Sequence, residues 1–340
     1  MIVALSGGVG GAKLALGLAR VMKPEDLTVV VNTGDDFEHL GLSISPDIDT
    51  VAYTLAGIAN REVGWGRHDE TWSFMETMET LGGETWVRLG DRDIALHVER
   101  TRRLGLGETL SEVTADICRR LGIKSRVVPM SDDPVRTRLY TDEGWLDFQD
   151  YFVHRRCEPV VHELRFQGAG AARPHPDVMA ALADPRLEAI VICPSNPFIS
   201  VEPILAIPGV RQAMIDSPAP VIAVSPIIAG QAVKGPTAKM MAELGMDPTA
   251  GRVAQRYSDL LDGYVVDHAD MAEVVSIDAR VTLAQTLMRT MEDRESLART
   301  VLDAAAVLRR RKAAVLSSRK AAAALSGGKA AAASSGGAAR

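Results

Sequence analysis

A glycine-rich segment near the N-terminus has a composition and spacing that suit phosphate chemistry. The segment SGGVGGAK, residues 6–13, lies between a predicted strand and a predicted helix. Glycines let a backbone approach a ligand closely, and the first turn of a helix offers free N–H groups to an anion. The spacing fits neither GxxxxGK[ST] nor GxGxxG, because Lys13 stands where the last glycine would be and Leu14 follows it. We predict nucleotide or phosphate binding, with a turn needed only for packing as the alternative. The residues concerned are Gly8, Gly10, Gly11 and Lys13.

Six aspartates stand in three short clusters further along the chain. One such cluster is readily explained by capping, because aspartate is favoured at helix N-termini. Three clusters in one chain are harder to explain in that way. Mg²⁺ prefers oxygen ligands and commonly combines one or two carboxylates with substrate phosphates. With the glycine-rich segment, the clusters therefore predict a nucleotide–metal site. Their members are Asp35 and Asp36, Asp47 and Asp49, and Asp91 and Asp93.

Two later loops carry small polar side chains next to proline. Ser195 and Asn196 follow the predicted strand at 189–192, and Ser225 follows the one at 221–224. Such residues form tight, shaped loops, which suits a ligand pocket. The seven histidines show no HExxH or HxH spacing, so we do not predict a histidine metal site.

These segments need a scaffold that brings them to one edge. Short β-rich runs alternate with helical stretches, which predicts an α/β, Rossmann-like, doubly wound fold with a mainly parallel sheet. In such a sheet, ligands bind beyond the carboxyl ends of the strands. A hairpin, 136–140 with 145–148, breaks the alternation and predicts an inserted subregion. The other predicted strands are 2–5, 28–31, 189–192 and 221–224, and a helix is predicted at 12–21.

Charge is distributed unevenly along the 340 residues. Residues 309–340 hold eight basic and no acidic residues, whereas residues 1–308 hold 44 acidic against 30 basic ones. An acidic body is a poor binder of nucleic acid, so we expect no nucleic-acid partner. We therefore predict one domain at 1–308 and a disordered Ala/Gly/Ser/Lys/Arg tail at 309–340, with a basic arm for an acidic partner as the alternative.

Three kinds of sequence feature indicate where a protein is located: cysteine pairs, long apolar stretches and an N-terminal signal peptide. Three widely spaced cysteines without a CxxC pair exclude a disulfide scaffold and a cysteine-ligated zinc site. No apolar stretch approaches the ~18–20 residues of a membrane span, so we expect no membrane partner. The N-terminus has no basic region followed by a long apolar run, so we expect no signal peptide. The expected location is the cytoplasm.

Taken in order, the loop segments resemble one known family, that of 2-phospho-L-lactate transferase, over roughly residues 1–305. Each motif alone is weak, but their order is specific. The motifs are GGVGGAKL, VNTGDD, SPDIDTVAYTLAG, GWG, LGDRDIALHVERT, VVPMSDDPVRT, FQDYFV, CPSNPFISVEPILAIPGVR and VSPIIAGQAVKGPTAKMM. The segment after residue 308 has no counterpart in the family pattern.

The resemblance implies a transfer reaction in the biosynthesis of the deazaflavin coenzyme factor 420. The implied donor is a three-carbon phospho-acid joined to GMP through a diphosphate, and the acid is 2-phospholactate, phosphoenolpyruvate or 3-phosphoglycerate. The implied acceptor is the ribityl hydroxyl of 7,8-didemethyl-8-hydroxy-5-deazariboflavin, called Fo. GMP leaves. The resemblance also makes a homodimer plausible.

The resemblance also assigns roles to residues. It implies an acceptor contact in the PDxDT segment, on Asp49, and another on the basic residue before LGD, Arg88. We predict Asp36 and Asp49 as Mg²⁺ ligands and Asp49 as the group that takes the hydroxyl proton. Gly8, Gly10, Gly11 and Lys13 are expected to cradle the diphosphate. Alternative metal ligands are Asp35, Asp47 and Asp91, and the residues expected to line the guanine-nucleotide side are Ser195, Asn196 and Ser225.

Two other functions compete with this one. A non-catalytic regulator of the same fold that binds a nucleotide sugar would share the glycine-rich start and the acidic second loop, but not the full PDIDT, LGDRD and FQD series. A nicotinamide-dependent oxidoreductase is disfavoured by the broken GxGxxG spacing. The sequence therefore favours the transferase.

Overall fold

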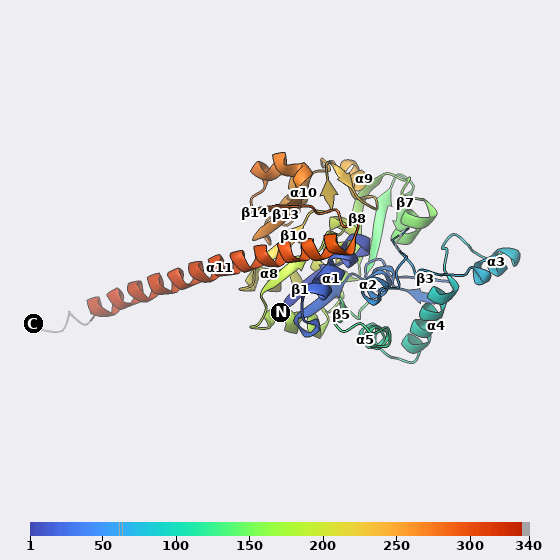
Figure 1. Cartoon of the computed structure of the whole chain (residues 1–340), viewed down its shortest axis with the longest axis horizontal. Coiled ribbons are helices and arrows are strands. Elements are labelled where there is room, and N and C mark those ends of the chain that lie inside the picture. The colour runs from blue at the N-terminus through green and yellow to red at the C-terminus, as the bar shows by residue number, and fades with distance from the viewer. Residues whose placement is uncertain (61, 63, 335–340) are drawn as a thin grey trace, which may run out of the picture.

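A seven-stranded parallel sheet forms the centre of the molecule (Figure 1). The computed structural model describes residues 1–60, 62 and 64–334, with side chains as far as Lys312. All six strand pairings in the sheet are parallel. The predicted Rossmann-like α/β fold is confirmed. In spatial order the strands are β14 (Arg280–Ala284), β13 (Gly263–Asp267), β10 (Val221–Val224), β9 (Ala189–Ile192), β1 (Ile2–Ser6), β2 (Leu27–Val31) and β5 (Arg126–Pro129).

Helices cover both faces of the sheet, which explains why the central strands are apolar throughout. All residues of β1, β2, β9 and β10 are buried, as expected for a parallel sheet enclosed on both sides. One face packs on α1 and α11, and the other on α6, α8, α9 and α10. The helices are α1 (Gly8–Val21), α2 (Pro46–Ala56), α3 (Ser73–Thr80), α4 (Asp91–Gly105), α5 (Leu110–Arg120), α6 (Pro176–Ala183), α7 (Glu202–Leu205), α8 (Val210–Asp216), α9 (Thr237–Glu243), α10 (Ala250–Arg256) and α11 (Met291–Ser334).

The strand order reverses between β1 and β9. From β1 the chain builds outward through β2 to β5, and later from β9 through β10 and β13 to β14. The loops that follow β1 and β9 therefore leave the sheet side by side, at the position where doubly wound folds bind ligands. This places the glycine-rich segment beside the Ser195 loop.

The predicted inserted hairpin is present and is larger than predicted. Strands β6 (Arg136–Thr141) and β7 (Gly144–Asp147) form it, and β8 (Val161–Gln167) adds a third antiparallel strand on the other side of β6. A second small hairpin, β3 (Phe37–His39) with β4 (Leu42–Ile44), lies with α3 and α4 on one side of the molecule (Figure 1). A separate small core holds that side together, formed by Ile44, Met75, Val87, Leu89 and Ile94.

The first helix begins earlier than predicted. The sequence pattern indicates a start at Ala12, but α1 begins at Gly8. Glycine has low helix propensity, so a pattern based on propensity excludes residues 8–11. Tertiary contacts override that propensity here, and most of the glycine-rich segment forms the first turn of α1.

The last helix runs far beyond the body of the protein (Figure 1). Helix α11 packs along α1 through Leu297, Ala298 and Val301 and continues to Ser334. The first residues of the predicted tail contact the body: Lys312 Nζ lies 3.0 Å from Asp262 Oδ2, and Arg309 lies 3.5 Å from Glu188. Residues 335–340 lie outside the described residues, and the division of the chain at residue 308 stays a prediction.

Apolar helices also occur within the core. Among the described residues, no single helix is long and apolar enough to cross a membrane. One bent pair, Pro197–Leu205 with Val210–Asp216 at 81°, meets the length and composition test. Its apolar side chains, such as Phe198 and Met214, belong to the buried core against the sheet.

Candidate active site

A cavity of about 640 Å³ lies at the carboxyl edge of the sheet. The loops after β1, β2, β9, β10 and β14 contribute to its wall, together with α2, the start of α4 and the segment at 148–153. Gly11 and Asp36 are buried but are not part of the lining. Most of the predicted site residues do line it: Gly8, Gly10, Lys13, Asp49, Arg88, Ser195, Asn196 and Ser225. The structure therefore brings these residues together, while their roles stay predictions.

The first turn of α1 is held close to neighbouring loops. Gly8 has a φ of +63°, which favours glycine, and its N–H donates to Asp47 Oδ1 at 2.6 Å. A Cβ on Gly10 would stand 2.3 Å from the carbonyl oxygen of Pro194. Gly10 therefore serves close packing between the start of α1 and the loop after β9. That packing places the helix N-terminus directly on the cavity wall.

The three polar residues predicted on the nucleotide side form hydrogen bonds to backbone, Ser195 to the loop after β1 and the other two within their own loops. Ser195 Oγ donates to the carbonyl oxygen of Gly7 at 2.8 Å and accepts from the Gly7 N–H at 3.2 Å. Asn196 Oδ1 accepts from the N–H of Phe198 at 2.9 Å. Ser225 Oγ donates to the carbonyl oxygen of Ile227 at 2.9 Å. These bonds fix the backbone that faces the cavity.

Two lysines line the cavity near the glycine-rich segment, Lys13 and Lys234. Lys13 Nζ donates to the carbonyl oxygen of Met288 at 3.0 Å. Burial, followed by the positive charges of Arg294 and Lys234, lowers the pKa of Lys13. Cations that repel one another beside a helix N-terminus make a favourable place for an anionic ligand.

Three buried carboxylates, Asp35, Asp36 and Asp47, lie near this end of the cavity, and Asp47 contacts the first turn of α1. Asp47 Oδ2 accepts from Asn32 Nδ2 at 2.8 Å, and Asp36 Oδ2 accepts from Ser45 Oγ at 2.8 Å. Among the described residues, Oδ1 of Asp35 and Oδ1 of Asp36 have no hydrogen-bond partner. Burial raises the pKa of Asp36 to about 7, and burial with the Asp47 charge raises the pKa of Asp35 well above its usual range. Buried negative charge is thus in excess here.

That excess fits a hard divalent cation. Asp35 and Asp47 both line the cavity and offer only oxygen, the donor that Mg²⁺ prefers. The unpartnered Oδ1 of Asp35 is the kind of buried acceptor that a cation would satisfy. Asp36, one of the two predicted ligands, does not line the cavity, so its neighbour Asp35 is the better placed of the two.

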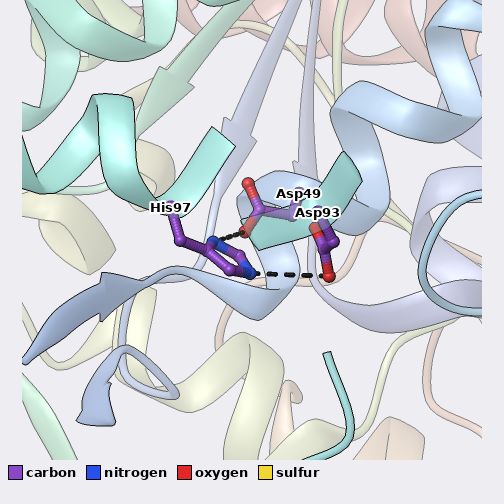
Figure 2. A group of neighbouring side chains, drawn as sticks. All are labelled: Asp49, Asp93 and His97. Carbon is purple, nitrogen blue, oxygen red and sulfur yellow. Dashed lines mark ion pairs between the residues drawn. The ribbon is translucent and has the colours of Figure 1, made fainter. Parts of the chain in front are cut away.

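A different arrangement surrounds the second predicted ligand, Asp49, on α2. Both oxygens of Asp49 accept hydrogen bonds from the guanidinium of Arg100, on α4, and Arg100 is 1% exposed. His97 lies between Asp49 and Asp93 (Figure 2), with Nδ1 3.7 Å from Asp49 Oδ2 and Nε2 3.4 Å from Asp93 Oδ2. The Tyr53 hydroxyl donates to Asp93 Oδ1. The two carboxylates therefore have partners within the protein.

Asp49, Asp93 and His97 are also close enough to be tested as a metal site, with one atom from each within 4.8 Å of the others. The two ring nitrogens of His97 face different carboxylates, however, and Asp49 already binds Arg100 through both oxygens. A mixed nitrogen and oxygen set also suits Mg²⁺ poorly. We therefore interpret the group as a chain of side chains compensated within the protein, through hydrogen bonds from Arg100 and Tyr53 and the close contacts of His97.

Arg88 and Asp91 have separate places beside this chain. The exposed Arg88 lines the cavity, and its guanidinium stacks over the Trp72 ring at 4.2 Å from the centroid. Asp91 is not among the cavity-lining residues, and it accepts from the N–H groups of Ser73 and Phe74 at 3.2 and 3.0 Å. The capping alternative thus describes Asp91, which is the first residue of α4 and caps the N-terminus of α3.

Sequence reasoning missed most of the chain around Asp49. Asp93, His97 and Arg100 are spaced i, i+4 and i+7, and Asp49 and Tyr53 are spaced i and i+4. Each spacing places side chains on one helix face, so helical periodicity could have grouped them. A search limited to known histidine metal motifs could not group these residues.

Comparison with known proteins identifies the family. A family model described as "2-phospho-L-lactate transferase CofD" matches residues 2–307. The chain belongs to this family. A phosphoenolpyruvate transferase of Kitasatospora aureofaciens is 42% identical over 318 residues, covering 91% of this chain and 98% of that protein. A 2-phospho-L-lactate transferase of Methanosarcina mazei is 38% identical over 306 residues, covering 89% of this chain and 100% of that protein.

A solved structure agrees on the fold. A UPF0052-family protein of Bacillus halodurans superposes with a TM-score of 0.60 at 13% identity, covering 88% of this chain and 98% of that one. Identity at that level supports the fold alone. The family membership shows that the chain is a transferase of the phospholactate and phosphoenolpyruvate type. The regulator that binds a nucleotide sugar is not favoured.

Proposed function

We propose that the protein transfers a phospho-three-carbon-acid group from its GDP-type diphosphate donor to the ribityl hydroxyl of Fo and releases GMP, in the biosynthesis of factor 420. The acid is 2-phospholactate, phosphoenolpyruvate or 3-phosphoglycerate. The observation that carries the proposal is that one cavity joins the first turn of α1, the Asp35 and Asp47 carboxylates, and Arg88. Relatives at 38–42% identity carry the names of two of these transfers.

The donor is proposed to lie over the first turn of α1. Backbone N–H groups at a helix N-terminus, with Lys13 and Lys234 nearby, would bind the diphosphate. Asp35 and Asp47 would hold Mg²⁺, which neutralises charge on the diphosphate when bound. The shaped loops at Ser195 and Ser225 would line the guanine-nucleotide side.

The acceptor is proposed to lie at the α4 side of the cavity. Apolar and aromatic side chains line that side, including Val87, Leu89, Phe148 and Phe152. The rings of Phe148 and Phe152 stack with centroids 5.3 Å apart. Such a wall suits a flat heterocycle, and Arg88 at its rim would bind a polar edge. A cytoplasmic location and a homodimer stay predictions alongside this assignment.

The test is a transfer assay with all three donors. The purified protein is incubated with Fo, Mg²⁺ and each guanylylated acid in turn, and product and GMP are measured by mass spectrometry. We expect one donor at least to give GMP and product in equal amounts, and none when Fo is omitted. Failure of all three donors with folded protein would refute the proposal. Binding of UDP-sugar or NAD instead would then favour one of the competing functions.

A further inference from the structure

The α4 side of the cavity holds two carboxylates with different partners, and the difference decides which one can take a proton. Both oxygens of Asp49 bind Arg100, whose guanidinium has only donors and keeps its charge in proteins. Protonating Asp49 would break a buried ion pair, which is costly. Asp49 is therefore a poor proton acceptor, although the sequence singled it out for that role.

Asp93 has no such guanidinium partner among the described residues. Its contacts are the Tyr53 hydroxyl on Oδ1 and His97 Nε2 on Oδ2. Arg100 Nη1 lies 3.3 Å from His97 Nδ1, and because arginine only donates, Nδ1 is assigned as the acceptor. A neutral His97 then carries its proton on Nε2, pointing toward Asp93. Asp93 therefore accepts one hydrogen bond, from Tyr53 on Oδ1, while His97 Nε2 faces Oδ2 at 3.4 Å without forming one. Burial raises the pKa of Asp93, but His97 and Tyr53 outweigh it and hold that pKa below its usual value, so the carboxyl is ionised.

Tyr53 is placed to connect this carboxylate with a ligand. It lines the cavity together with Asp93, and its hydroxyl hydrogen is used in the bond to Asp93. Its oxygen keeps lone pairs that can accept a hydrogen bond from a ligand hydroxyl. Burial, with the nearby Asp49 and Asp93 charges, raises the pKa of Tyr53 well above its usual range, so the phenol stays protonated until it is used.

We propose that Tyr53 and Asp93 form a proton relay for the acceptor hydroxyl, with His97 and Arg100 as positioning residues. The inference rests on the proposed function. As the bond from the hydroxyl oxygen to phosphorus forms and the bond from phosphorus to the GMP oxygen breaks, the hydroxyl proton passes to Tyr53 Oη. The proton of Tyr53 passes to Asp93 Oδ1 in the same step. GMP leaves with the electron pair, and Asp93 later returns its proton to solvent.

The experiment compares two near-isosteric variants with matched controls. Tyr53→Phe removes only the hydroxyl, and Asp93→Asn keeps the shape while removing the basic oxygen. Tyr257→Phe makes the same change in a buried tyrosine that does not line the cavity, and Glu99→Gln changes an exposed carboxylate on α4. For each variant kcat, KM for Fo, melting temperature and Fo affinity by fluorescence titration are measured.

We expect kcat to fall by about 10²- to 10⁴-fold in both relay variants, the range for lost acid–base catalysis. Fo affinity and melting temperature stay close to wild type, and both controls keep wild-type kcat. Unchanged kcat in Tyr53→Phe, or a loss that appears only in KM or in melting temperature, would overturn the relay while leaving the transfer reaction intact. A wild-type protein that transfers nothing would instead refute the proposed function, and the relay with it.

Discussion

The two ends of the cavity differ in how their buried carboxylates are compensated. At the glycine-loop end, formed by residues 7–13 with Asp35 and Asp47, carboxylates are buried in excess, and Asp35 has an oxygen that no described residue satisfies. At the α4 end, formed by Asp49, Tyr53, Asp93, His97 and Arg100, each carboxylate is paired within the protein. We propose that a ligand cation completes the first end, whereas groups of the protein itself compensate the second. We infer that charge compensation at the first end belongs to substrate binding and at the second to folding.

Among the changes that test this comparison, Asp35→Asn should show the largest effect on activity. Loss of a cation ligand should lower kcat/KM by about 10³-fold, because charge stabilisation by a metal contributes several kcal/mol in the transition state. The melting temperature without Mg²⁺ should not fall, because burial and the Asp47 charge raise the pKa of Asp35 and disfavour its charged form, which asparagine lacks. Asp36→Asn is the matched control, one residue along and outside the cavity lining. A larger loss in Asp36→Asn than in Asp35→Asn would restore Asp36 as the ligand.

The main effect of Asp49→Ala should be a lower free energy of unfolding. Removing one partner of a buried ion pair typically costs about 3–5 kcal/mol of unfolding free energy. Denaturant unfolding of the single variants Asp49→Ala and Arg100→Met, and of the double variant, gives the coupling between them. We expect the double variant to be more stable than the sum of the single losses predicts. Additive losses would show that the pair is not coupled, and that the α4 end is not internally compensated.

Arg88→Ala should have a moderate and selective effect. Its stacking on Trp72 at an exposed site is worth only about 0.5–1 kcal/mol, so the fold should tolerate the change. If Arg88 contacts the acceptor, KM for Fo should rise by about tenfold, with KM for the donor unchanged. Steady-state kinetics with each substrate varied in turn separates the two. Equal changes in both constants would contradict an acceptor contact.

Truncation at the C-terminus should have the smallest effect. Ending the chain after Lys312 keeps the contacts of Arg309 and Lys312 with the body, so kcat and melting temperature should match the full chain. Ending it after Leu308 removes both contacts, and exposed ion pairs are worth only about 0–1 kcal/mol. Thermal melts and transfer assays of the two truncated chains test this. A large loss of kcat in either would show that the segment after residue 308 takes part in the reaction.

The sequence predicted the scaffold better than the contacts within it. Buried runs such as 2–5 and 221–224 are apolar because both faces of the sheet are covered, so the parallel strands could be recognised locally. The third strand of the insertion, β8, was missed, because its exposed and buried residues alternate irregularly. We predicted that α1 starts at Ala12 rather than Gly8, because the low helix propensity of glycine is overridden by packing on the Pro194 loop.

The residues of the cavity were predicted more fully than their partners. Gly8, Lys13, Asp49, Arg88 and Ser195 could be found from segment composition and family resemblance. That Arg100 binds Asp49 could not, because the two stand 51 residues apart and meet only in the folded chain. A carboxylate's role depends on such long-range partners, which is why the choice among the six aspartates needed the structure.

The most direct test of the difference between the two ends is binding with and without Mg²⁺. Calorimetric titration of the wild-type protein with GDP and with Fo, each in excess Mg²⁺ and in excess chelator, measures each end separately. We predict that chelation weakens GDP binding by at least about tenfold, or about 1.4 kcal/mol, and leaves Fo affinity unchanged within error. Unchanged GDP binding in chelator, or an equal loss for both ligands, would contradict the assignment of the cation to the glycine-loop end.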